Sequence, residues 1–218
     1  MLLGIYGAGG LGREILILAR QINENGKRWD DCLFIDDTKK QSVLFGQQVL
    51  SFDEVKDKYT GESLEVIIAV GEPHARKILR ERVTEADFSL TVLIHPSVMI
   101  DNSTKLGWGT VVGLNCFISC DISIGENVLI QPNACIGHDN QIGNDSVIST
   151  FVCIAGGCII GDETYIGLNV PIKENIKIGN QSIVGMGSVV SRDIPDQVIA
   201  LGNPARVMKD NIEHKVFH

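Results

Sequence analysis

The feature that most constrains the fold of this chain is a hydrophobic period of six residues. From residue 94 to residue 190 an aliphatic side chain stands at every sixth position without a break: Ile94, Ile100, Leu106, Val112, Ile118, Ile124, Ile130, Ile136, Ile142, Ile148, Ile154, Ile160, Ile166, Ile172, Ile178, Val184 and Val190. A helix needs a period of about 3.6 and a half-buried strand a period of about 2, so neither element alone explains the pattern. A short strand followed by a turn, repeated every six residues, does explain it.

Glycine often follows the aliphatic residue, and a small or β-branched residue often stands two positions before it. This pattern predicts a parallel β-solenoid in which each hexad forms one flat side and three hexads close one triangular coil. Residues 18 positions apart then stack at about 4.8 Å, the spacing of neighbouring strands. The aliphatic residues are expected inside the coils and the small residues at their tight corners.

The pattern resembles the hexapeptide-repeat acyltransferases over roughly residues 94 to 206. The resemblance implies a left-handed β-helix, a homotrimer, and acetyl-CoA as co-substrate in the grooves between subunits. Pro195 breaks the register, and the "GNPA" segment resembles the end of many such helices. Arg206 and Lys209 near that end either approach the coenzyme phosphates or are simply solvated.

The N-terminal residues show a different sequence pattern. The apolar "LLGIY" precedes Gly7, Gly9 and Gly12 in G-x-G-x-x-G spacing, an amphipathic stretch follows, and "CLFIDD" reads as a second strand ending in two acids. This is the pattern of a Rossmann-like βαβ unit whose glycine turn admits phosphate oxygens to a helix N-terminus. The unit is too short for a full dinucleotide fold, so we expect one nucleotide rather than NAD. The expected division is an α/β domain at 1–92 and an all-β domain with a C-terminal cap at 93–218.

The segments "YGAGGLGREI", "FIDD", "AVGEPHARK" and "IHPSV", followed by the hexads, resemble the bacterial nucleotide-sugar acetyltransferases of the PglD and NeuD type over essentially the whole chain. The resemblance implies that the N-terminal unit holds a sugar nucleotide. Its glycine turn would lie against the substrate, its paired acids would meet the nucleoside, and two further residues would contact the substrate. The implied contacts are Gly9, Gly10, Leu11, Asp36, Asp37, Gly71 and Arg76.

His138 stands two positions after the interior residue Ile136, where a side chain should point outward near a turn. Acetyl transfer from a thioester needs a base near neutral pKa to remove the acceptor's proton, and histidine suits that task. A neighbouring carboxylate, here Asp139, can fix the tautomer of the ring. A surface histidine in a solenoid turn is the alternative interpretation. The family resemblance implies that His138 and Asp139 are the catalytic pair, although the acid in this family is usually a glutamate.

Gly156 lies 18 positions after His138, one coil further along the solenoid. A tetrahedral intermediate needs a donor for its oxyanion, and Gly156 resembles the family glycine whose backbone N–H meets the thioester carbonyl. An ordinary turn glycine would look the same in sequence. By the same resemblance, Leu168 and Met186 line the coenzyme groove through their backbones.

Composition excludes several classes of partner. A formal net charge of -8 and the lack of clustered Lys and Arg argue against nucleic acid or an anionic membrane. No apolar run approaches the roughly 18 residues of a membrane span, and no secretion signal is recognisable, so we expect a cytoplasmic protein. Six cysteines without a C-x-x-C pair are expected to be free thiols.

The predicted function is acetyl-CoA-dependent N-acetylation of a nucleotide-linked 4-amino sugar, with no metal. Three alternatives stay open at this stage. They are O-acetylation of sialic acid or another sugar, a non-catalytic nucleotide-binding scaffold, and a β-helix carbonic anhydrase, which would need three metal-binding histidines. The sequence does not determine the nucleotide base, the sugar or the acyl length.

Overall fold

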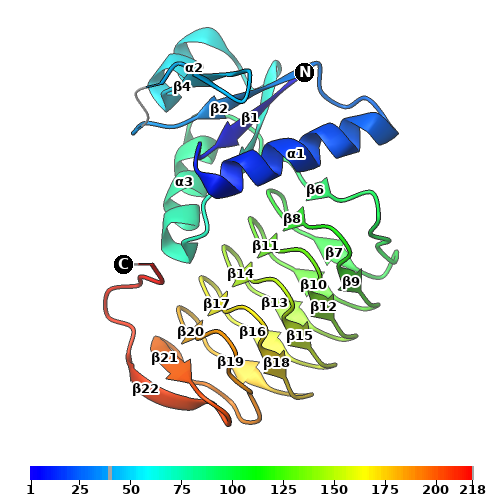
Figure 1. The fold of residues 1–218 in the computed structure, drawn as a ribbon, viewed down its shortest axis with the longest axis vertical. Coiled ribbons are helices and arrows are strands. Elements are labelled where there is room, and N and C mark those ends of the chain that lie inside the picture. Colours follow the sequence, from blue (N-terminus) through cyan, green and yellow to red (C-terminus); the bar gives the residue numbers. More distant parts are fainter. Residues whose placement is uncertain (39–40, 218) are drawn as a thin grey trace.

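The computed structural model describes residues 1–38 and 41–217, which form a small α/β unit set on one end of a long solenoid (Figure 1). The α/β unit contains a five-stranded sheet in the order β3-β4-β2-β1-β5, in which only the β3–β4 pair is antiparallel. Its elements are β1 (Leu2–Tyr6), α1 (Gly10–Asn25), β2 (Asp31–Ile35), β3 (Val43–Leu44), β4 (Gln47–Leu50), α2 (Phe52–Lys58), β5 (Leu64–Ile68) and α3 (Pro73–Glu85).

Local sequence explains where these helices begin and end. Gly9 adopts an extended conformation just before α1, and Gly26 ends the helix with an extended backbone. Ser51 and Glu54 form a capping box at the start of α2. Pro73 occupies the first turn of α3, where its missing N–H costs nothing.

The solenoid stacks two-residue strands in three parallel columns, and one column ends in two longer strands, of which the last is antiparallel (Figure 1). One column is a sheet in the order β22-β21-β20-β17-β14-β11-β8-β6, the second is β19-β16-β13-β10-β7, and the third is β18-β15-β12-β9. The strands are β6 (Leu93–Ile94), β7 (Lys105–Leu106), β8 (Val111–Val112), β9 (Phe117–Ile118), β10 (Ser123–Ile124), β11 (Leu129–Ile130), β12 (Cys135–Ile136), β13 (Gln141–Ile142), β14 (Val147–Ile148), β15 (Cys153–Ile154), β16 (Ile159–Ile160), β17 (Tyr165–Ile166), β18 (Pro171–Ile172), β19 (Lys177–Ile178), β20 (Ile183–Val184), β21 (Val198–Leu201) and β22 (Arg206–Asp210).

Register within each column is 18 residues from β6 to β20, as the hexads predict, and it shortens to 16 between β20 and β21. Ile136 pairs with Ile118 on one side and Ile154 on the other. The aliphatic residue of each hexad points inward, and those from Val112 to Val190 form one continuous core with the small corner residues, in which Ile94, Ile100 and Leu106 are only partly buried. Three hexads per coil and the interior position of the aliphatic residues are therefore confirmed.

The three corners between the columns differ in sequence. We give each corner a name and define it by the turns that it comprises. The apolar corner comprises turns 113–116, 131–134, 149–152, 167–170 and 185–188. The open corner comprises turns 119–122, 137–140, 155–158 and 173–176. The docking corner comprises turns 125–128, 143–146, 161–164 and 179–182, and it faces α3.

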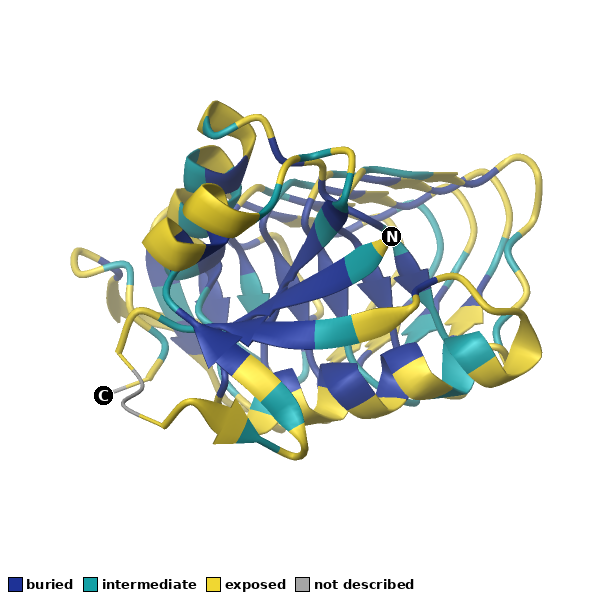
Figure 2. Cartoon of the chain, turned by 90° about the horizontal axis from the view of Figure 1, so that it is seen from above, coloured by how far each residue is buried: buried dark blue, intermediate teal, exposed yellow. Residues whose placement is uncertain are grey.

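The α/β unit and the solenoid share a hydrophobic core. Buried residues of α1, such as Ile15 and Leu18, belong to the same cluster as Leu93, Val111 and Leu129, whose side chains point outward from the eight-stranded column. Figure 2 shows buried and exposed residues alternating along α1. Within the described residues no helix is long and apolar enough to cross a bilayer.

Candidate functional site

The glycine turn after β1 combines one packing glycine with two open ones. A Cβ on Gly12 would collide with the carbonyl oxygen of Gly7, so Gly12 is needed where α1 crosses the strand end. Gly9 has no neighbour within 4 Å of a Cβ position, and Gly10 has only the Arg13 side chain at 3.9 Å. Gly9 and Gly10 therefore expose backbone at the N-terminus of α1, which is the arrangement that accepts an anionic group.

The two acids at the end of β2 have different partners. Asp36 accepts a hydrogen bond at 2.9 Å from the backbone N–H of Ala8, within the glycine turn, and two more from Thr38. This carboxylate holds the turn against the second strand. It lies at the carboxyl edge of the sheet, where ligands of open α/β sheets bind.

Asp37 lies in a separate polar network. Its carboxylate accepts from the Tyr6 hydroxyl at 2.7 Å, from Arg82 at 2.6 Å and from the backbone N–H of Phe52 at 2.9 Å. Burial opposes ionisation, but these hydrogen bonds outweigh it and hold the pKa of the Asp37 carboxyl below its usual range. Asp37 is thus an ionised group that ties the end of β2 to β1, α2 and α3.

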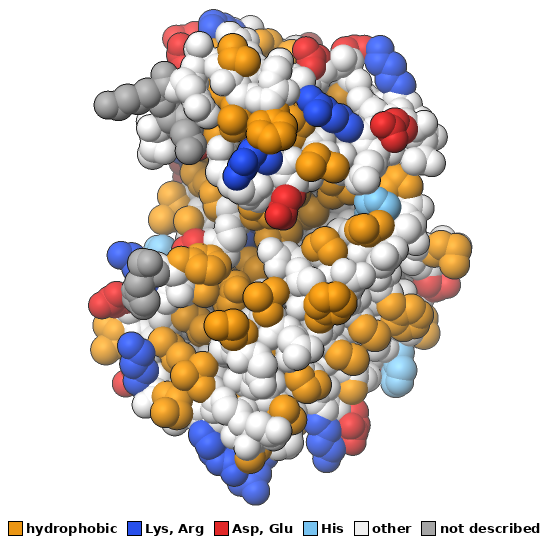
Figure 3. All heavy atoms as spheres, in the orientation of Figure 1, with side chains coloured by type: hydrophobic (Ala, Val, Ile, Leu, Met, Phe, Trp, Pro, Cys, Tyr) orange, Lys and Arg blue, Asp and Glu red, His pale blue; other side chains and the backbone are white. Residues whose placement is uncertain are grey.

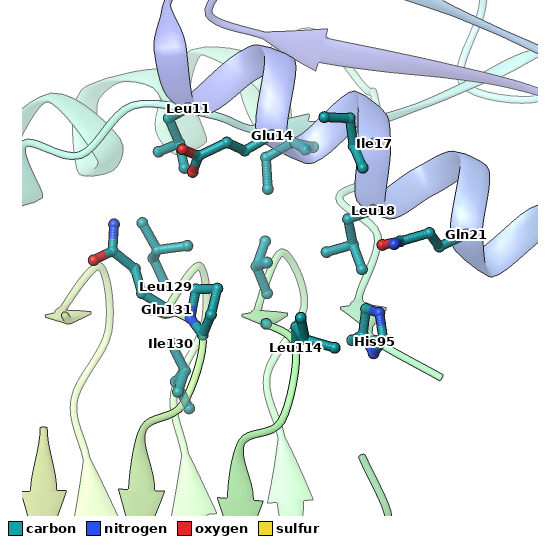
Figure 4. A pocket seen from close by; sticks show the side chains of 14 residues that line it. Leu11, Glu14, Ile17, Leu18, Gln21, His95, Leu114, Leu129, Ile130 and Gln131 are labelled. Carbon is teal, nitrogen blue, oxygen red and sulfur yellow. The ribbon is translucent and has the colours of Figure 1, made fainter. Parts of the chain in front are cut away.

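The cleft between α1 and the solenoid begins at the glycine turn. It has a volume of about 220 Å³ and is walled mainly by aliphatic side chains of α1, of strands β8 and β11, and of the adjoining turns of the apolar corner. Figure 4 shows Leu11, Glu14 and Leu18 on the helix side facing Leu114 and Gln131 on the solenoid side. On the face drawn in Figure 3 a hollow separates the two units. Leu11, expected from the sequence to contact substrate, therefore lines a real cavity.

Gly71 lies at the end of β5, at the same edge of the sheet. The ring of Phe217 is 3.5 Å from the position that a Cβ on Gly71 would take. The backbone N–H groups of Val216 and Phe217 donate to the carboxylate of Glu72. The C-terminal segment therefore lies against Gly71 and Glu72, beside the predicted nucleotide site, and no sequence pattern predicts this contact.

The prediction that Arg76 contacts substrate is wrong for this structure. The side chain is fully buried, and its guanidinium donates to the carbonyl oxygens of Ile68, Val70 and Asn127 and to the side chain of Asn127. These contacts occupy the donors of the guanidinium. Arg76 instead joins α3 and β5 to the solenoid.

His138 and Asp139 lie on the open corner, each with 63 % of its side chain exposed. The imidazole Nδ1 is 2.6 Å from a carboxylate oxygen of Asp139. Asp139 has a φ of 59°, the left-handed turn conformation that aspartate tolerates. When the Nδ1–H donates to Asp139, the second ring nitrogen, Nε2, carries the lone pair of a base.

Gly156 lies directly beneath the His138 ring. A Cβ at Gly156 would be 2.5 Å from Cε1 and 2.7 Å from Nε2 of the imidazole, so only glycine lets the ring rest there. Among the described residues, no acceptor hydrogen-bonds the backbone N–H of Gly156. The same holds for the equivalent N–H groups of Cys120, His138 and Glu174 along this corner. A column of unpaired N–H groups thus runs past the imidazole.

At the docking corner the equivalent N–H groups are closed by side chains from the next coil. Glu126 N–H donates to Asn144 at 2.8 Å, Asn144 N–H to Asp162 at 2.7 Å, and Asp162 N–H to Asn180 at 2.9 Å. A side chain of the next coil can therefore accept a hydrogen bond from this turn N–H, and at the open corner none of the described side chains does.

A ladder of polar residues at this corner binds α3, and the sequence analysis did not identify it. Asp145 is 1 % exposed and accepts from Arg80 at 2.8 Å and from Asn127 at 2.7 Å. Glu163 accepts from His74 and Lys77, both at 3.0 Å. The signal that would have revealed it is the recurrence of amide and acid residues every 18 positions at 127, 145, 163 and 181.

Leu168 and Met186 lie on the apolar corner, with exposed fractions of 45 % and 76 %. The third column of strands separates this corner from His138 and Gly156. A single chain therefore does not bring the predicted coenzyme-lining residues together with the predicted catalytic pair.

No cluster of three or more His, Cys, Asp or Glu side chains suited to a metal ion occurs in residues 1–38 and 41–217. His95 belongs to the cleft beside α1, and His138 lies on another corner.

Comparisons with known proteins agree with this arrangement. Residues 3–83 match the family model of the PglD N-terminal domain. No curated protein sequence matches the chain. The solved structure of PerB from Caulobacter crescentus, in complex with CoA and GDP-perosamine, is similar at a TM-score of 0.87 and 27 % identity, covering 95 % of this chain and 97 % of that one.

Two further solved structures cover similar lengths. The acetyltransferase domain of PglB from Neisseria gonorrhoeae, in complex with acetyl coenzyme A, has a TM-score of 0.86 and 26 % identity over 95 % of this chain and 98 % of that one. WeeI from Acinetobacter baumannii has a TM-score of 0.75 and 28 % identity over 95 % and 100 %.

Residues 3–83 thus match the PglD N-terminal domain, and the whole chain is similar in fold to solved sugar N-acetyltransferase and acetyltransferase structures. It is an acyltransferase by this likeness. The predicted fold class, an α/β unit followed by a left-handed parallel β-helix, is confirmed.

Proposed function

We propose that this protein transfers the acetyl group of acetyl-CoA to the amino group of a nucleotide-linked 4-amino sugar. The observation that carries the proposal is the open corner, where an imidazole oriented by a carboxylate lies over an unpaired backbone N–H. Two solved structures similar to this chain hold CoA with GDP-perosamine and acetyl coenzyme A, respectively.

The two units divide the binding task. We assign the sugar nucleotide to residues 1–92, with the phosphates at Gly9 and Gly10 and the nucleoside near Asp36 and Asp37. Gly71 borders the same site. The sugar would extend into the cleft that begins at Leu11, whose aliphatic walls suit the apolar face of a deoxy sugar. The thioester belongs to residues 93–218.

The transfer step follows from the geometry around His138. The sugar amine attacks the carbonyl carbon of the thioester and loses a proton to Nε2 of His138. The carbonyl oxygen becomes an oxyanion, which the N–H of Gly156 stabilises. The intermediate then collapses, the C–S bond breaks, and the coenzyme leaves as a thiol after taking the proton from the imidazolium. Asp139 stabilises that imidazolium while it exists.

We also propose that the active protein is a homotrimer, because one chain leaves the parts of the site on different corners. The outward side chains of the third column are Phe117, Cys135, Cys153 and Pro171, an apolar strip between the open and apolar corners. Packing of a second copy against this strip would bring Leu168 and Met186 of one chain near His138 of the other. An apolar strip that becomes buried between two subunits is typical of obligate interfaces.

The test is thiol release from acetyl-CoA in the presence of a panel of GDP-, UDP- and dTDP-linked 4-amino sugars, with free sialic acid as the hydroxyl acceptor. We expect turnover with at least one amino-sugar nucleotide and a loss of about 10²- to 10⁴-fold in His138→Ala, the range for removal of a general base. Turnover with sialic acid alone would establish O-acetylation instead. Equal turnover in His138→Ala would overturn the proposed mechanism.

A further inference from the structure

Asn140 is an unusual residue for its place in the repeat. It occupies the inner corner position of the hexad, which elsewhere holds small, aliphatic or hydroxyl residues, and its neighbours one coil away are Ile122 and Cys158. The side chain is fully buried. Burying an amide in such a stack is unfavourable unless its donors and its acceptor are all paired, and here they are.

The Asn140 amide makes three hydrogen bonds. Its nitrogen donates to the carbonyl oxygen of Gly137 at 2.7 Å and to that of Ala155 at 3.0 Å, and its oxygen accepts from the backbone N–H of Cys158 at 2.8 Å. One side chain therefore ties its own turn, 137–140, to the turn of the next coil, 155–158.

The two carbonyl groups belong to the peptide units that matter most at this corner. The carbonyl of Ala155 shares its peptide unit with the N–H of Gly156, and the carbonyl of Gly137 shares its unit with the N–H of His138. In a planar trans peptide the N–H points opposite to the C=O. Because Asn140 holds both oxygens inward, both N–H groups point outward from the coil, on the side where the imidazole lies.

A hydrogen bond to a carbonyl oxygen also polarises the peptide and strengthens its N–H as a donor. Asn140 thus acts on the Gly156 amide in two ways, by direction and by polarisation. Among the described residues, its side-chain amide has no hydrogen bond to the imidazole ring or to the carboxylate of Asp139.

The docking corner shows what an ordinary residue does at this position. The hydroxyl of Ser146 donates to the Gly161 carbonyl at 2.8 Å and accepts from Thr164 N–H at 3.0 Å. It makes the two contacts to the next coil but none to the carbonyl of Gly143, which is the counterpart of Gly137. Within its own turn Ser146 reaches only the carbonyl of Asn144, at 3.3 Å. Of the two side chains, only the Asn140 amide holds the carbonyl groups that share peptide units with the first turn N–H of both coils.

We propose that Asn140 is a positioning residue that fixes and polarises the Gly156 N–H as the oxyanion donor, in register with the turn that carries His138. This inference rests on the acetyl transfer proposed above. It adds a residue to the site that neither touches substrate nor lies on the surface.

The test compares two substitutions of the same kind at two corners. Asn140→Val places a β-branched residue, like Val128 or Val152 in the same hexad position, and removes all three hydrogen bonds. We expect kcat for thiol release to fall about ten- to hundredfold. This loss of kcat does not exceed the one that follows complete removal of an oxyanion donor. The KM for acetyl-CoA and the shape of the pH–rate profile should stay the same, because the imidazole keeps its partner.

Ser146→Val is the matched control. It removes the equivalent bonds at the docking corner and should lower the melting temperature to a similar extent while kcat stays within about twofold of wild type. Asn140→Ser should regain the two contacts to the next coil, as Ser146 makes them, and give an intermediate kcat. This second variant also covers the case in which Asn140→Val does not fold.

The outcomes separate this inference from the function on which it rests. If the wild type turns over and Asn140→Val has the same kcat, the positioning role is overturned and the acetyl transfer is left intact. An equal loss of kcat in Ser146→Val has the same consequence. Absence of wild-type turnover with every amino-sugar nucleotide overturns both. A selective loss at Asn140 with partial recovery in Asn140→Ser supports both.

Discussion

The open corner and the docking corner are built from the same hexad, yet they serve different ends. At the docking corner the N–H groups of Glu126, Asn144 and Asp162 are each capped by an amide or carboxylate 18 residues later. The side chain that follows Asn144, Asp145, binds α3. At the open corner the corresponding N–H groups have no acceptor within the described chain, and the imidazole of His138 lies over Gly156.

This difference shows that a binding site can form in a solenoid where one repeated hydrogen bond, the side-chain cap on the turn N–H, is absent. The coils, the strand register and the interior ladder are alike at both corners. What changes is whether the polar groups of the turn are satisfied within the chain. Where they are, the corner is structural, and where they are not, the corner is prepared for a ligand that supplies the missing acceptor.

The largest effect is expected from breaking the docking corner. Asp145→Ala removes a buried carboxylate that pairs with Arg80 and also accepts from Asn127. Loss of one partner of a buried ion pair costs about 3 to 5 kcal/mol, so the free energy of unfolding should fall by that amount in chemical denaturation.

Glu126→Ala is the control for this substitution. Glu126 is half exposed and lies 3.6 Å from the same arginine, so its removal should cost less than about 1 kcal/mol. Similar losses in the two variants would show that the docking corner does not depend on the buried pair.

A methyl group on a glycine should act differently at the two corners. In Gly156→Ala the added Cβ meets the exposed imidazole of His138 at 2.5 Å, so the ring must move while the coil stays intact. We expect a loss of about hundredfold in turnover and little change in melting temperature. In Gly161→Ala the Cβ meets the backbone nitrogen of Asn180 at 2.5 Å, and backbone cannot move aside cheaply. That variant should lose stability by about 1 to 3 kcal/mol.

Thiol-release kinetics and thermal unfolding on both variants check this contrast. A destabilised Gly156→Ala with normal turnover per folded molecule would contradict the idea that the glycine serves the imidazole.

The coiled architecture was readable from the sequence because it depends on a repeated local rule. Seventeen aliphatic residues in register require a six-residue unit, and the pairing of Ile136 with Ile154 follows from it. His138 stood out for the same reason, as a residue that breaks the pattern of its neighbours.

Contacts between the two units were not readable in that way. Arg76 sits in a helix of ordinary composition, and only the three-dimensional placement of α3 against Asn127 shows that its donors are used internally. The repeat marks Asn140 as an amide at an inner corner position, but it does not show what that amide binds. Its role depends on which carbonyl groups converge on one buried amide, and no periodicity encodes that convergence.

The smallest expected effect comes from converting the open corner toward the docking corner. Asp162 N–H is capped by Asn180, 18 residues later. The residue at the same spacing from Gly156 is Glu174, whose side chain is 57 % exposed. The turns that follow are alike, since Asn175 and Gln181 both have left-handed φ values, 58° and 54°.

Glu174→Asn should therefore place an amide oxygen on the Gly156 N–H. One added hydrogen bond should raise the free energy of unfolding by about 0.5 to 1 kcal/mol. Because the thioester oxygen must then compete with that cap, turnover should fall about tenfold, which corresponds to about 1.4 kcal/mol of transition-state stabilisation. Glu174→Gln, whose longer side chain does not reproduce the cap, should change neither quantity. A gain in stability joined to a loss of rate would show that the unpaired N–H is kept open for the reaction, whereas a stabilised variant with full activity would place the oxyanion donor elsewhere.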